Sequence, residues 1–206
     1  MNNSLKFNTI KCCIVGSCNV GKTSIIQKYI SKKNGLTDTT LGAIYWLIEH
    51  TSKSGIKFKI DFWDTAGQER YNSLIPMYSR NSDIIILVFD ITDRHSFLEL
   101  NKWVKIIKEH NTLSNIVLVG NKFDREFFRR VHNTEIKQFV TDNFNDNIIY
   151  LETSANSGFN IDILFQKIFD LAECKLKLRD SNSQSNKLEF KILDNDENYY
   201  KCCSIL

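Results

Sequence analysis

The sequence predicts an α/β fold, in which helices cover both faces of a mostly parallel six-stranded sheet. Strand-like and helix-like segments alternate along most of the chain, and residues 84–89 form a nearly continuous apolar run. A parallel strand is buried on both faces because the helices that connect parallel strands cover both sides of the sheet. Alternation together with uninterrupted apolar strands therefore indicates repeated strand–helix units.

The N-terminal part of the chain supplies the first three strands. Residues 9–15 are apolar enough for a strand, and residues 23–31 carry apolar side chains at helical spacing. Residues 44–51 and 57–63 have strand composition, and the turn-forming residues 52–55 join them into a hairpin.

The second half of the chain continues the alternation after the strand at 84–89. Residues 95–110 place apolar side chains on one side of a predicted helix, and residues 116–119 form a further buried strand. We predict a helix at residues 134–144, a short strand at 148–151 and a last helix at 160–177.

The composition changes after Arg179. Residues 180–187 are rich in Ser, Asn and Gln and show no apolar periodicity, which is typical of a flexible segment. We therefore predict a domain at residues 1–178 and a flexible tail at residues 179–206.

Composition narrows the function classes. The 206 residues are 42% hydrophobic and 25% charged, and the net charge of +3 is too small to indicate a nucleic-acid partner. No apolar run approaches the ~18–20 residues of a membrane span, and the N-terminus lacks the apolar core of a signal peptide. The six cysteines have neither disulfide nor zinc spacing, and we expect Cys12 and Cys13 to be buried small hydrophobes. A cytosolic chain is expected.

Residues 16–23 read Gly-Ser-Cys-Asn-Val-Gly-Lys-Thr and lie between a predicted strand and a predicted helix. This order of glycines, lysine and hydroxyl residue is the pattern of a phosphate-binding loop. Gly16 and Gly21 permit close approach of the backbone, whose N–H groups face the phosphate oxygens. Lys22 would reach the β- and γ-phosphates, and Thr23 would offer its hydroxyl to Mg²⁺. The other residues predicted to line the nucleotide here are Ser17, Cys18, Asn19, Val20 and Ser24.

A second motif selects the base. Asn121, Lys122 and Asp124 follow a predicted buried strand. The Asp124 carboxylate can accept hydrogen bonds from the N1–H and the exocyclic amine of guanine, a pair of donors that adenine lacks on that edge. Asn121 can brace the site and contact the base. Ser154 and Ala155 follow the next short strand, and the Ala155 N–H could donate to guanine O6.

A third group of residues predicts chemistry at the γ-phosphate. Asp64 follows a strand and can hold Mg²⁺ through water, Gly67 can present its N–H to the γ-phosphate, and Gln68 can orient the attacking water. Thr40 lies in the loop between the first helix and the second strand and can ligate Mg²⁺ when that loop closes over a γ-phosphate. Thr23, Thr40 and Asp64 are therefore the predicted metal residues.

With these motifs in place, the chain resembles the Ras superfamily of small GTPases, specifically its Rab branch, over residues 8–178 and again at the C-terminus. The resemblance implies the P-loop NTPase fold of small G-proteins, binding of GTP and GDP with Mg²⁺, and slow GTP hydrolysis. The Rab-like stretches are residues 41–45, 62–69, 70–74 and 87–92, and residues 71–80 look most like the early-endocytic Rabs.

The resemblance also implies partners and a location. Tyr45, Trp63 and Tyr78 would form the aromatic cluster that effectors read, with ordinary core packing as an equal alternative for Trp63. A guanine nucleotide exchange factor, a GTPase-activating protein and a GDP-dissociation inhibitor or escort protein would act on a monomer. The switch would serve vesicle tethering and fusion on the cytoplasmic face of endosomal membranes, cycling with the cytosol.

Three departures from the family pattern concern nucleotide turnover. Residues 32–36 lack the aromatic that usually stacks on the guanine, so we expect faster nucleotide release. Asn156 stands where a lysine is common and removes a lysine stem from the surroundings of the base. Cys18 and Asn19 put side chains near the γ-phosphate and Gln68, so we expect slower hydrolysis.

The last residues predict a lipid anchor. Cys203 and the three residues after it satisfy the prenylation pattern, and the final leucine favours geranylgeranyl. Cys202 supplies a second thiol, and two lipid chains anchor more stably than one. Residues 180–201 are not polybasic, so attraction of the tail to anionic lipid would be a minor contribution.

Two alternatives remain open from the sequence. The non-glycine residues of the phosphate loop suit a GTP-binding scaffold with little turnover, although Gln68 argues against it. A P-loop nucleoside kinase or ATPase would need an acceptor-binding lid, and none is apparent in the sequence.

Overall fold

The computed structural model describes residues 8–32, 43–65, 75–110, 115–144 and 148–183. Six strands form one sheet in the order β2-β3-β1-β4-β5-β6. The strands are β1 (Asn8–Val15), β2 (Ala43–Thr51), β3 (Lys57–Thr65), β4 (Ile84–Asp90), β5 (Asn115–Asn121) and β6 (Ile149–Glu152). Strands β2 and β3 pair in antiparallel fashion and every other neighbouring pair is parallel, which confirms the predicted mostly parallel sheet.

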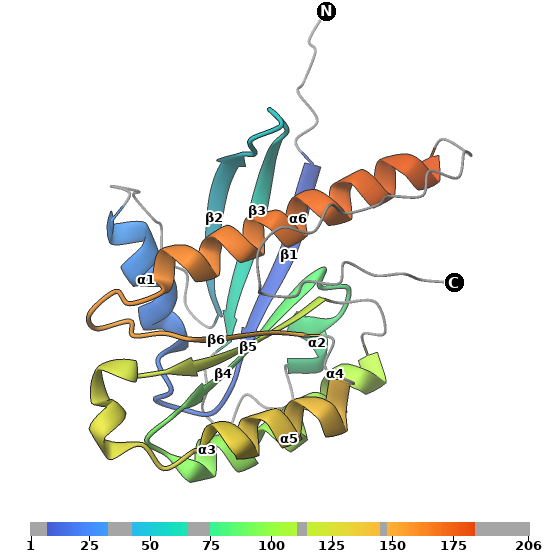
Figure 1. Ribbon diagram of the computed structural model, residues 1–206. Coiled ribbons are helices and arrows are strands. Elements are labelled where there is room, and N and C mark those ends of the chain that lie inside the picture. Colours follow the sequence, from blue (N-terminus) through green and yellow to red (C-terminus); the bar gives the residue numbers. More distant parts are fainter. Residues whose placement is uncertain (1–7, 33–42, 66–74, 111–114, 145–147, 184–206) are drawn as a thin grey trace, which may run out of the picture.

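Helices cover both faces of this sheet (Figure 1). On one side lie α1 (Lys22–Lys32) and the long α6 (Ile161–Ser183). On the other side lie α3 (Arg94–Leu98), α4 (Leu100–His110) and α5 (Asn133–Phe144). Two short helices, α2 (Ile75–Ser79) and the 3₁₀ helix η2 (Phe123–Phe128), complete the described elements. Among the described residues, no helix is both long enough and apolar enough to cross a bilayer.

Alternation along β1 divides the core between the two helical layers. Ile10, Cys12 and Ile14 pack with α1 and α6, whereas Cys13 and Val15 pack with α3, α4 and α5. Successive side chains of a strand point to opposite faces, so a central strand must be apolar on both. Both Cys12 and Cys13 are fully buried, as predicted. All residues of β4 are buried too, which is the cause of its uninterrupted apolar run.

The helix boundaries differ from the prediction in two places. The segment 95–110 is divided at Glu99, the residue between the end of α3 at Leu98 and the start of α4 at Leu100. The last helix was predicted to end at Lys177 and continues to Ser183. Arg179 donates to the carbonyl of Thr9 at 3.2 Å and pairs with Asp83. These tertiary contacts hold a segment whose serine and asparagine residues are poor helix formers.

Candidate functional site

The predicted site residues gather at one edge of the sheet. The phosphate loop follows β1, Asp64 lies near the end of β3, Asn121 ends β5, and residues 153–156 follow β6. These strands run parallel, so their carboxyl ends meet at the same edge. In open parallel sheets this edge is where ligands bind.

Backbone geometry explains the two glycines of the phosphate loop. Gly16 has a φ of 150°, and a Cβ there would lie 2.1 Å from the carbonyl oxygen of Val88. Gly21 has a φ of 96°, and a Cβ there would lie 2.3 Å from Nδ2 of Asn121. L-residues rarely adopt such φ values. The loop therefore packs against β4 and β5 only because both positions lack a side chain.

Lys22 opens α1 and folds back over the loop. Its Nζ donates to the carbonyl oxygens of Gly16 at 2.8 Å and Ser17 at 2.7 Å. Burial lowers the pKa of this ammonium group, against the opposing pull of Asp64. The two bonds fix a cation at the start of a helix, where backbone N–H groups also face an incoming anion. This arrangement suits a phosphate ligand.

The remaining loop residues divide into buried and exposed groups. Val20 is buried, and the buried Ser17 hydroxyl donates to the carboxylate of Glu99. Cys18, Asn19 and Ser24 are exposed, and Asn19 has a φ of 62°. Glu99 lies 82 positions from Ser17, so no sequence motif connected it with the loop.

The side chains of Thr23 and Asp64 contact each other in an arrangement that suits a metal ion. The Thr23 hydroxyl donates to Oδ2 of Asp64, while Oδ1 of Asp64 is buried and has no hydrogen-bond partner among the described residues. Burial raises the pKa of Asp64, although Thr23 and Lys22 oppose that shift. Buried carboxylate oxygens are normally satisfied. Hard oxygen donors of this kind suit Mg²⁺, so the two residues fit the predicted metal.

Asn121 connects three loops of the site. Its Nδ2 donates to the carbonyl of Val20 at 2.8 Å. Its Oδ1 accepts from the Thr153 hydroxyl and from the Ala155 N–H, both at 3.2 Å. The side chain therefore braces the phosphate loop against the segment after β6. The Ala155 N–H, expected to reach guanine O6, is directed to Asn121 here, and Thr153 is a buried site residue that the motif reading missed.

Asp124 presents its carboxylate at the surface of the site. Oδ1 accepts from the Ser154 hydroxyl at 2.6 Å, and Oδ2 accepts from Nδ2 of Asn156 at 3.1 Å. The Ser154 bond, with help from Asn156, lowers the pKa of Asp124 and keeps it ionised. An ionised carboxylate only accepts hydrogen bonds, and each oxygen retains a lone pair for a further donor. Asp124 can therefore receive two N–H donors from one ligand edge.

Lys122 and the neighbouring aromatic residues fix the approach to Asp124. Lys122 has a φ of 69°, and its ammonium pairs with Asp90 at 2.7 Å. Phe123 stacks on Phe159 with ring centroids 4.6 Å apart. The turn between β5 and η2 is thus held from both sides.

A partly buried ion pair stabilises the same edge of the sheet. Arg129 donates to both carboxylate oxygens of Glu152, at 2.8 and 2.7 Å, and Tyr150 donates to Glu152 at 2.7 Å. Burial alone would raise the pKa of Glu152, but the bonds from Arg129 and Tyr150 outweigh it and the pKa is lowered. This pair ties the end of η2 to the end of β6.

Replacing Arg129 with methionine is expected to lower the free energy of unfolding by about 1–3 kcal/mol at neutral pH. The loss should shrink as the pH falls below 4.5, the ordinary pKa of Glu152, because a carboxylate with a lowered folded-state pKa stabilises only while ionised. Urea unfolding across this pH range measures it, with the exposed neighbour Arg130→Met as control. A loss independent of pH would contradict the assignment to this ion pair.

The three predicted effector-facing aromatics lie together. Tyr45 and Trp63 meet edge-to-face with centroids 5.5 Å apart, and Trp63 and Tyr78 lie 5.7 Å apart. All three are partly buried, and Trp63 and Tyr78 also pack against the core between the sheet and α3, α4 and α5, so core packing of Trp63 stays an alternative. The contact of effectors with these three residues remains a prediction. The predicted residues Thr40, Gly67, Gln68, Cys202 and Cys203 lie outside the described residues.

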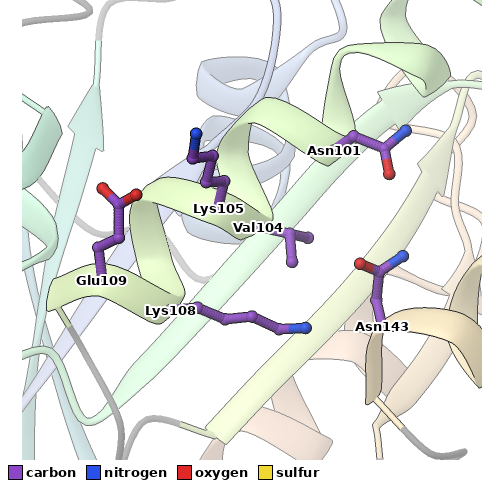
Figure 2. A pocket seen from close by; sticks show the side chains of 6 residues that line it. All are labelled: Asn101, Val104, Lys105, Lys108, Glu109 and Asn143. Carbon is purple, nitrogen blue, oxygen red and sulfur yellow. The ribbon is translucent and has the colours of Figure 1, made fainter.

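A surface hollow of about 380 Å³ lies elsewhere, between α4 and α5 (Figure 2). Lys108 extends from α4 toward Asn143 on α5, and the hollow is lined mainly by polar side chains. None of its lining residues belongs to the site described above. The hollow therefore contributes nothing to the nucleotide chemistry.

Comparison with known proteins agrees with this geometry. Residues 11–174 match the Ras family model. The Ras-related protein Rab-31 of Homo sapiens is 39% identical over 163 residues, which cover 77% of this chain and 80% of that protein. The Ras-related protein Rab-5A of Dictyostelium discoideum is 31% identical over 208 residues, which cover 99% of this chain and 100% of that protein. The phosphate loop, the Asn121–Asp124 motif and these relatives agree: the chain belongs to the Ras family and is a Rab-type small GTPase.

Proposed function

We propose that this GTPase is a nucleotide-regulated membrane switch of endocytic vesicle traffic. Its GTP-bound and GDP-bound states would differ in the loops that carry Thr40 and Gln68, which follow the γ-phosphate in proteins of this kind. The single observation that supports the nucleotide assignment is the set of bonds from Asn121 to the carbonyl of Val20 in the phosphate loop and to the N–H of Ala155 after β6. These bonds join the loop proposed for phosphate to the segment proposed for the base.

Mg²⁺ is the proposed cofactor. Thr23 and Asp64 would hold it together with Thr40. Oδ1 of Asp64, which has no hydrogen-bond partner in the part of the chain that the structure describes, supports this choice. When bound, the ion supplies neutralisation of the charge that develops on the phosphate oxygens. Lys22 would stabilise the same charge, and Gln68 would orient the attacking water.

The proposed regulators and location follow from the family. An exchange factor, a GTPase-activating protein, a GDP-dissociation inhibitor or escort protein, and effectors contacting Tyr45, Trp63 and Tyr78 would act on a monomer. Prenylation of Cys202 and Cys203 would hold the chain on the cytoplasmic face of endosomal membranes. The rival scaffold without turnover predicts the same binding and no hydrolysis.

Nucleotide competition and single-turnover hydrolysis test the proposal. GTP and GDP should displace a fluorescent guanine nucleotide and ATP should not, because adenine lacks the paired donors for Asp124. Hydrolysis should be slow, require Mg²⁺ and accelerate in Cys18→Gly if the Cys18 side chain crowds the attacking water. Displacement by ATP would exclude the guanine site, and absence of hydrolysis even with a GTPase-activating protein would favour the scaffold.

A further inference from the structure

Two phenylalanines of η2 project into solvent. Phe127 is 95% exposed and Phe128 is 66% exposed, and their rings meet edge-to-face with centroids 5.6 Å apart. Large apolar side chains usually bury most of their surface, and adjacent exposed ones mark interaction sites. Nothing in the nucleotide chemistry requires aromatic residues at these two positions.

Two guanidinium groups flank the aromatic pair. Arg125 and Arg130 are exposed, and neither side chain forms an ion pair among the described residues. Two carboxylates of η2 have partners of their own: Glu126 pairs with Arg129 at 3.3 Å, and Asp124 accepts from Ser154 and Asn156. Arg125 and Arg130 are therefore the cations next to the rings that can bind an anionic ligand. We call Arg125, Phe127, Phe128 and Arg130 the aromatic tip.

The shape of the aromatic tip favours a bilayer over a shaped pocket as partner. A side chain with 95% of its surface exposed stands clear of its neighbours, and no residue of the tip lines the hollow between α4 and α5. A membrane accommodates projecting rings at its headgroup boundary without a matching surface. Guanidinium groups bind lipid phosphates and carboxylates in bidentate fashion.

The length of the C-terminal tail allows the tip and the lipid anchor to share one membrane. Residues 184–206 follow α6 and end with the cysteine pair. Twenty-three residues reach up to about 75 Å when extended, far more than the ~35 Å length of a 23-residue helix such as α6. The tail also lacks a basic cluster, so the tail itself would contribute little attraction to anionic lipid.

We propose that the aromatic tip is a second membrane contact. Phe127 and Phe128 enter the headgroup boundary, and Arg125 and Arg130 bind anionic lipid headgroups. Because η2 begins within the Asn121–Asp124 motif and contains Asp124, the contact turns the guanine end of the sheet toward the bilayer. Because η2 carries neither Thr40 nor Gln68, the contact is the same with GDP and with GTP bound.

Vesicle co-sedimentation of the full chain tests this contact without the lipid anchor. The chain carries Cys202→Ser and Cys203→Ser, so the outcome is independent of prenylation. It should bind vesicles of equimolar phosphatidylcholine and phosphatidylserine and bind poorly to phosphatidylcholine alone. Phe127→Ser with Phe128→Ser should lower the partition coefficient at least about tenfold, since transfer of apolar surface drives insertion. Arg125→Gln with Arg130→Gln should remove the preference for phosphatidylserine.

Leu47→Ser is the matched control, because Leu47 is 43% exposed on β2 at the opposite edge of the sheet. Its partition should equal that of the parent chain. Phe127→Trp reports insertion directly, because brominated lipids should quench the fluorescence of the added tryptophan. The GDP affinity of every variant verifies that it is folded. No partition by the parent chain, equal partition of the double serine variant, or absence of quenching would overturn the proposal. If the double serine variant partitions as the parent chain does, the tip would be a protein-binding surface instead of a membrane contact.

Discussion

Asn121→Ala is expected to weaken GDP binding by about 100-fold, because the phosphate loop and the segment after β6 lose the side chain that joins them. The side chain is 2% exposed and satisfies the Val20 carbonyl, the Thr153 hydroxyl and the Ala155 N–H. These bonds are already present without nucleotide, so the loss of affinity comes from ordering the loops again on binding, and 100-fold corresponds to about 2.8 kcal/mol. Water entering the gap would offset part of the loss.

Nucleotide dissociation and urea unfolding measure this effect together. The free energy of unfolding of the nucleotide-free chain should fall by about 2–4 kcal/mol, because the same bonds brace the free site. Asn101→Ala is the control. Asn101 is an exposed residue of α4, and its side chain donates to the carbonyl of Leu98 at 3.2 Å. Unchanged GDP dissociation in Asn121→Ala would show that the loops hold their positions without this amide.

The parts of the fold that the sequence predicts are those determined by local pattern. β4 is a continuous apolar run because both its faces are buried, and that run is visible without a structure. The glycines of the phosphate loop are equally visible, because only glycine tolerates their backbone geometry and the 2.1 Å approach to Val88. At these positions the physical constraint acts on the residue type itself, so it is visible in the sequence.

The parts that the sequence could not supply depend on contacts between distant residues. Ser17 and Glu99 are 82 positions apart, and Arg179 is held by Thr9 and Asp83. No periodicity reports such bonds, so neither the contact of Glu99 with the phosphate loop nor the length of α6 was predicted. The exposure of Phe127 is a similar case, because its apolar character alone would have placed it in the core.

Asp64→Asn should separate binding of nucleotide from its dependence on Mg²⁺. In the presence of excess Mg²⁺, GDP affinity is expected to fall by about 10–100-fold, the usual effect of losing an outer-shell carboxylate. In excess EDTA, the affinities of variant and parent chain should be equal, because Lys22 and Asp124 bind the phosphates and the base without Asp64. Titration of fluorescent GDP under both conditions measures the two affinities.

Asparagine has almost the same shape as aspartate but carries no charge. Asparagine preserves the volume of the buried Asp64 and an oxygen that can accept from Thr23, so the loops stay in place while the charge is lost. Asp142→Asn, an exposed position on α5, is the control and should change neither affinity. Equal loss of affinity with and without Mg²⁺ would mean that Asp64 organises the phosphate loop rather than the metal. Oδ1 of Asp64 has no hydrogen-bond partner among the described residues, which supports a role at the metal, because buried carboxylate oxygens are normally satisfied.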